Sequence, residues 1–133
     1  MKIFVAASVA AIAAAIVTSA IAAAPAAPQV TRKVLLTQDL ASAGGQVVEI
    51  MVEIPAGGRE GKHTHPGALV VYVQEGNLTL DYEGKPTVTY KPGETFFIET
   101  GKVHEGINNG TTGVKAIATY VGVKGQPLAS PVP

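Results

Sequence analysis

The sequence contains no cysteine, and this absence excludes three kinds of chemistry. Disulfide bonds, zinc sites with thiolate ligands and cysteine nucleophiles all require the missing residue. A lipoprotein anchor, which is attached to a cysteine, is excluded for the same reason. An exported form of the chain must therefore be stabilised by a hydrophobic core, a metal ion or an oligomer.

The sequence also lacks an excess of either charge. It has 10 basic and 10 acidic residues, which give a formal net charge of zero, and charged residues make up only 15% of the chain. Proteins that bind nucleic acids normally carry a basic excess, so we expect no nucleic-acid partner. The length of 133 residues allows one domain with a substantial core, but not two.

The apolar residues are concentrated at the N-terminus, where 20 of the first 24 residues are apolar and Lys2 is the only charge. A basic start, an apolar stretch and small residues at Ala20 and Ala22 are typical of a signal peptide, here residues 1–22. The alternative is an uncleaved membrane anchor. It is less favoured because alanine, a weakly hydrophobic residue, dominates the stretch and no basic stop-transfer cluster follows. The sequence thus predicts a periplasmic or secreted protein that has no membrane contact after cleavage.

The rest of the chain lacks any segment with helical periodicity and instead shows short strand patterns at a spacing of about 8–12 residues. In the clearest pattern, Val48, Ile50 and Ile54 alternate with Glu49 and Glu53. We predict an all-β, antiparallel sandwich or barrel over residues 46–124. A lead-in with a first strand precedes it at 23–45, and an extended tail follows at 125–133. The predicted strands cover residues 34–36, 47–54, 69–73, 78–82, 87–90, 95–98, 103–107 and 114–123.

All three histidines belong to two short patterns, His63-Thr64-His65 and His104. Residues i and i+2 of a strand point to the same face, so His63 and His65 would lie side by side, and a neighbouring strand could add His104. Imidazole is a good ligand for zinc, copper, iron and nickel, and three protein ligands leave positions open for water or substrate. The alternative is a solvated pair in the loop after Lys62.

Longer motifs surround these histidines. The first is Gly57-x5-His63-x-His65 followed by residues 69–76 (LVVYVQEG), and the second is residues 91–97 (KPGETFF) followed by His104-x3-Asn108. Together they resemble the two motifs of the cupin superfamily over about residues 46–123. The resemblance implies a double-stranded β-helix, or jelly-roll barrel, that is often a homodimer. It also implies that His63, His65 and His104 bind a divalent transition metal, namely Fe, Mn, Ni, Cu or Zn.

The sequence departs from the cupin pattern at Leu69, where the family usually has a glutamate as fourth ligand. Activities that need this glutamate are therefore in doubt. Cupin dioxygenases that act on thiols and β-diketones resemble this chain in using three histidines alone, so the resemblance still implies a metal. Leu69 and Val71 share one strand face and are candidates for the wall of a pocket for a small, partly hydrophobic ligand. The alternative is packing in the core, which is the favoured role of Val71, whereas Leu69 could do both.

Other polar residues are expected to serve the structure. Glu105 is expected at the solvated surface, on the side of its strand opposite His104. Arg59 and Lys62 are expected in a solvated loop, with attraction of an anionic substrate as the alternative. Asn108 is expected to shape a turn.

Three functions remain open at this point. The first is a metal-dependent enzyme, with an Fe(II) dioxygenase as the leading form and an isomerase or lyase using Zn, Mn or Ni close behind. The second is a non-catalytic module that binds a metal ion or small molecule. The third is a metal-free structural barrel. A shared fold does not specify which of them applies.

Overall fold

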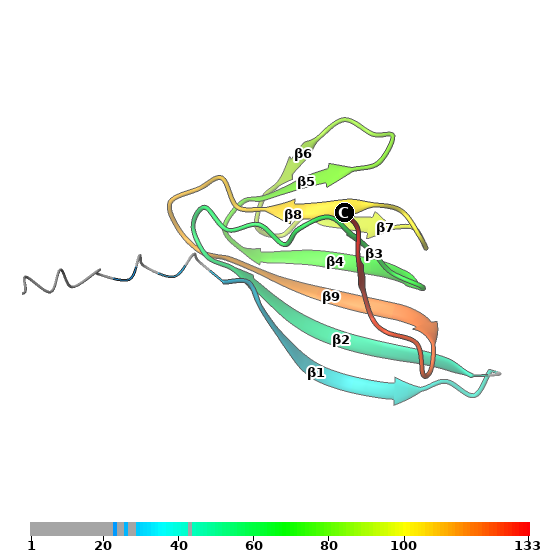
Figure 1. Ribbon diagram of the computed structural model, residues 1–133. Helices are drawn as coiled ribbons and strands as arrows, with labels where there is room; N and C mark the ends of the chain where they lie inside the picture. The colour runs from blue at the N-terminus through cyan, green and yellow to red at the C-terminus, as the bar shows by residue number, and fades with distance from the viewer. Residues whose placement is uncertain (1–22, 24–25, 27–28, 43) are drawn as a thin grey trace, which may run out of the picture.

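A computed structural model describes residues 23, 26, 29–42 and 44–133, which form two antiparallel sheets of five strands each (Figure 1). The predicted signal segment 1–22 lies outside the described residues and stays a prediction. Within the described part of the chain there is no helix that is long and apolar enough to cross a membrane.

The first sheet contains the long strands and the second the short ones. The first has the order β1 (Thr31–Asp39), β2 (Gly45–Ile54), β9 (Val114–Val123), β4 (Ala68–Glu75) and β7 (Thr95–Ile98). The second has the order β10 (Ser130–Pro131), β3 (His63–Thr64), β8 (His104–Ile107), β5 (Leu78–Tyr82) and β6 (Val88–Tyr90). Both sheets direct alternate apolar side chains into a common core, as the period of two in their sequences requires.

The expectation of a closed barrel is wrong in one respect. Among the described residues no strand of one sheet pairs with a strand of the other, so the molecule is a two-sheet jelly roll with free edges. Strand β1 is one such edge, and all nine of its residues are exposed. Strand β10, at an edge of the second sheet, has only two residues, and one of them is Pro131, which has no N–H to donate to a ladder.

The predicted strands agree best with the structure where the apolar pattern is regular. Strands β5, β7 and β9 have the predicted bounds. Strand β1 runs over nine residues instead of the predicted three, because it pairs with β2 along its whole length, with a register shift between Val34 and Leu36. The extended tail also does more than predicted, since Ser130 and Pro131 join the second sheet beside β3.

A close approach of two chain segments packs the residues just before β4 against β9. Gly67 lies so near β9 that a Cβ atom there would overlap the carbonyl oxygen of Val121 and the ring of Tyr120. Only glycine fits this passage. The segment that carries His65 is thereby packed against the end of β9.

Candidate metal centre

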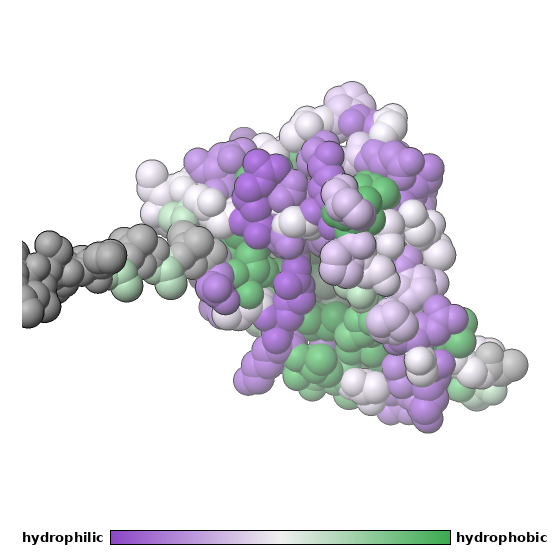
Figure 2. All heavy atoms as spheres, viewed as in Figure 1, coloured by the Kyte–Doolittle hydropathy of each residue, from purple (hydrophilic) through white to green (hydrophobic). Residues whose placement is uncertain are grey.

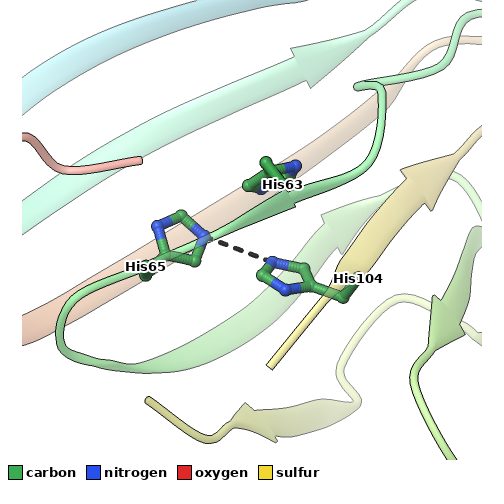
Figure 3. Close-up of side chains that lie close together, drawn as sticks. All are labelled: His63, His65 and His104. Carbon is green, nitrogen blue, oxygen red and sulfur yellow. Dashed lines mark hydrogen bonds between the residues drawn. The ribbon is translucent and has the colours of Figure 1, made fainter. Parts of the chain in front are cut away.

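The strand register brings the three histidines together. His63 on β3 is the direct cross-strand partner of His104 on β8, and neighbours in such a pair lie side by side. His65 lies two residues beyond His63 and its ring reaches the same point (Figure 3). The ring centroids lie 4.4 Å apart for His63 and His104 and 4.9 Å apart for the other two pairs. All three side chains are buried.

Each imidazole is oriented by a backbone carbonyl. The Nδ1 atom lies 2.7 Å from the oxygen of Gly61 in His63, 2.6 Å from that of Leu128 in His65, and 3.0 Å from that of Lys102 in His104. A carbonyl oxygen only accepts, so Nδ1 must be the protonated, donating nitrogen in all three rings. In a neutral ring the other nitrogen, Nε2, then carries a free lone pair, and the three Nε2 atoms become the available ligands.

The environment favours the neutral form of these rings. Burial lowers the pKa of His65 to about 4, and burial likewise lowers the pKa of His104. Yet the Nε2 atoms of His65 and His104 lie only 3.2 Å apart, the contact that is dashed in Figure 3. With both Nδ1 atoms donating, a hydrogen bond there would need a cationic ring. Neutral rings instead place two lone pairs face to face, an arrangement that a shared cation would stabilise.

The spacing fits a metal ion. Two imidazoles bound to one ion at about 2.0–2.1 Å have nitrogens about 2.9 Å apart at right angles and about 3.3 Å apart in a tetrahedron. The observed 3.2 Å lies in that range. One ligand atom from each histidine lies within 4.8 Å of those from the other two. The donor set of three neutral imidazoles suits Zn, Cu, Fe or Ni.

An ion pair between the exposed Arg59 and the buried Glu105 supports the segment before His63. Arg59 donates to both oxygens of Glu105, from Nε at 3.0 Å and from Nη2 at 2.7 Å, and the backbone N–H of Gly61 donates to Oε1 at 3.1 Å. Gly61 is also the residue whose carbonyl accepts from His63. The Arg59 guanidinium holds the pKa of Glu105 below its usual range. The expectation that Glu105 is solvated is therefore wrong, because Glu105 is 4% exposed and binds Arg59.

The three histidines open onto a cavity between the two sheets, with a volume of about 130 Å³. Leu69 and Val71 from β4 line it, and the first sheet supplies most of its other apolar lining. Figure 2 shows hydrophobic residues gathered over β1 and β2, beside the C-terminal segment. Among the described residues that line this cavity, none is a tyrosine.

Two charged residues that sequence reasoning missed also line the cavity. Arg32 on β1 donates from Nη2 to Oε1 of Glu60 at 2.9 Å, and Glu60 Oε2 accepts from the backbone N–H of Gly106 at 3.1 Å. Arg59 and Lys62, the basic residues considered for this role, are not among the lining residues. Alternation counted back from His63 would put Glu60 on the opposite face, but Gly61 has a positive φ of 80° and breaks that count.

Sequence reasoning also missed the role of the C-terminal segment at the site. It crosses from the end of β9 to β3 (Figure 1), and Leu128 both lines the cavity and holds His65 through its carbonyl oxygen. The proline-rich sequence 125–133 carries no signal of this contact. Asn108, by contrast, shapes a turn as expected, since its Nδ2 donates to the carbonyls of Ile54 and Thr112.

Comparison with known families decides what kind of protein this is. The sequence profile of the cupin domain matches residues 50–120, more than half of the chain. The chain is a cupin. The match confirms the resemblance that the two histidine motifs carry.

Solved structures show the same fold at low identity. The cupin is similar to an uncharacterized conserved protein with a double-stranded β-helix domain from Klebsiella pneumoniae (19% identity, 80% of this chain and 89% of that chain, TM-score 0.64). It is also similar to the polyketide cyclase RemF from Streptomyces resistomycificus (22%, 77% and 70%, TM-score 0.61). A third similar structure is the DMSP lyase DddQ from Ruegeria pomeroyi (21%, 65% and 43%, TM-score 0.60).

These similarities establish the fold of the cupin and not its reaction. The chain spans less than half the length of the lyase. A search of curated proteins finds no match.

Proposed function

We propose that this cupin binds a divalent transition metal through the Nε2 atoms of His63, His65 and His104 and acts as an oxygenase on a small, largely apolar organic substrate. The convergence of the three imidazole rings carries the proposal. All three rings have Nδ1 committed to a carbonyl, and two Nε2 atoms are 3.2 Å apart. Such a set of lone pairs has no other evident partner than a cation.

The residues around the centre define what it can accept. When bound, an Fe or Cu ion would supply redox chemistry, and a Zn, Mn or Ni ion Lewis-acid chemistry, at the positions that three imidazoles leave open. The cavity of about 130 Å³ is close to the roughly 150 Å³ that accommodates benzene, so the enclosed part of a substrate has about six heavy atoms. Its apolar walls, including Leu69 and Val71, exclude water and pack against a hydrocarbon body.

A non-catalytic binding module is the second candidate. It is favoured by Leu69, which replaces the usual carboxylate, and by the lack of a tyrosine among the described lining residues. Both features leave fewer groups able to transfer protons.

One experiment separates these functions. Metal content is measured on protein isolated from its native compartment, and O₂ consumption is then recorded with a panel of small organic substrates. We expect about one transition metal per chain and O₂ consumption that disappears with the metal. Stoichiometric metal without turnover on any substrate would support the binding module. Protein that takes up none of Fe, Mn, Ni, Cu or Zn above pH 7 would contradict both.

Export and dimerisation complete the proposal. Residues 1–22 would direct the chain to the periplasm or the medium, and intact-mass measurement of the recovered protein tests cleavage after Ala22. A homodimer is supported by the exposed edge β1, where Val34, Leu35 and Leu36 are each about half exposed. Such an edge is normally covered. Light scattering coupled to size-exclusion chromatography tests it, and a monomer at micromolar concentration would contradict it.

A further inference from the structure

We infer that Glu60 is a specificity-determining residue, and that the cavity selects ligands which carry an O–H or N–H donor at the end away from the metal. The inference rests on the proposed metal centre. It adds a second anchoring point to that centre, provided by a carboxylate outside both histidine motifs. Arg32 positions this carboxylate.

The first observation is the contrast between Glu60 and its surroundings. Apart from the three histidines, Arg32 and Glu60 are the only residues with polar side chains among the described residues that line the cavity. The side chain of Glu60 is only 13% exposed, and that of Arg32 is 45% exposed. An ion pair with one partner this exposed contributes little to the stability of a fold. A few placed polar groups in an apolar pocket instead fix the orientation of a ligand.

The second observation is how firmly the carboxylate is held. Oε1 accepts from Arg32 at 2.9 Å and Oε2 from the backbone N–H of Gly106 at 3.1 Å. A Cβ atom at residue 106 would lie 2.5 Å from Oε2, so the glycine provides the space that Glu60 occupies. A carboxylate has about four acceptor positions, and these two bonds leave the others for a ligand.

The third observation concerns position. Glu60 and Arg32 line the same cavity as the three histidines, so a ligand in that cavity meets both charges. Glu60 is absent from the cluster of close ligand atoms, which contains the three histidines alone. It is therefore placed to meet the far end of a ligand and not to coordinate the metal. An anionic far end would be repelled by it, whereas a donor would be bound.

The test uses the full-length folded domain loaded with Co²⁺, whose visible spectrum reports ligand binding. The probes are matched carboxylic acids with a methyl, hydroxyl or carboxylate far end, such as butyrate, 4-hydroxybutyrate and succinate, each at three chain lengths. We expect one hydroxy acid to bind about tenfold more tightly than its methyl counterpart, the effect of one hydrogen bond to a charged group. The dicarboxylates should bind most weakly.

Two variants assign the preference to Glu60. Glu60→Gln should reduce the hydroxyl preference and improve dicarboxylate binding, and Gly106→Ala should do so by displacing the carboxylate without changing any charge. Glu75→Gln, an exposed acidic residue outside the cavity, is the control and should behave as the wild type. The preference of the wild type is measured without any variant, so a variant that fails to fold leaves the test valid.

The outcomes are distinct. If Co²⁺ is not bound at the histidines, the proposed function fails. If Co²⁺ binds but hydroxyl and methyl probes differ by less than twofold at every length, the role of Glu60 is overturned. If a dicarboxylate binds best, Arg32 is the recognition group and the inference is equally overturned.

Discussion

The two sheets of this cupin share one core but differ in what they contribute. The first sheet has three strands of 9–10 residues and one of eight, and it supplies the apolar wall with Leu69 and Val71. The second sheet has strands of two to five residues and supplies His63 and His104. Long, regular ladders make the first sheet a scaffold. The second sheet instead holds its histidines through hydrogen bonds from their rings to backbone carbonyls.

The largest loss of metal affinity is expected at His104. His104→Ala removes one of three ligands, and metal affinity should fall by more than the 10–100-fold that outer contacts typically contribute. Isothermal titration with Zn²⁺ or Co²⁺ measures it, with circular dichroism to verify the fold. A variant that keeps one tightly bound metal per chain would show that the histidines are not the ligands.

Leu69, on the first sheet, should behave in the opposite way, because its substitution should affect stability and not metal affinity. Leu69→Ala should destabilise the metal-free protein by about 2–5 kcal/mol, because it truncates a buried core side chain, and should leave metal affinity unchanged. Urea denaturation measures the first effect and titration the second. Val70→Ala, on the exposed face of the same strand, is the control and should change stability by less than about 0.5 kcal/mol. A large loss of metal affinity in Leu69→Ala would remove the distinction between the sheets.

The stability of the metal-free protein should depend on pH through His65. The pKa of His65 is about 4 in the fold and near 6.5 in the unfolded chain. Between these values only the unfolded chain takes up the proton, so stability is complete above pH 6.5 and falls as the pH decreases. The loss should approach about 3 kcal/mol near pH 4. Denaturation of the wild type and of His65→Asn at pH 7.5, 6 and 5 measures this loss. If the stability of both proteins falls equally with pH, His65 is not its cause.

A smaller effect is expected at Glu105, which links β8 to the loop before His63. Glu105→Gln keeps the shape but loses the charge that binds Arg59, so Gly61 and the ring that it holds become less fixed. Metal affinity should fall about 10–100-fold, which corresponds to about 1.4–2.7 kcal/mol. The control is Glu99→Gln, which breaks an exposed pair with Lys85 and should leave affinity unchanged. Equal affinities for both variants would contradict a positioning role.

The same contrast explains how far the sequence could be interpreted. The alternation in β9 predicts its bounds, because a strand buried on one face must repeat every two residues. The grouping of the histidines follows from the motifs. Glu60 could not be predicted, because the positive φ of Gly61 reverses the side to which it points. Neither could Leu128, whose contact with His65 uses a backbone carbonyl and is therefore independent of side-chain type.

The central claim is that three Nε2 atoms hold one metal ion. X-ray absorption spectroscopy at the edge of a stoichiometrically loaded metal tests it most directly. The geometry predicts three imidazole nitrogens at about 2.0–2.1 Å for zinc, with the remaining scatterers being oxygen. A spectrum with fewer than two imidazoles, or one unchanged by His104→Ala, would contradict it.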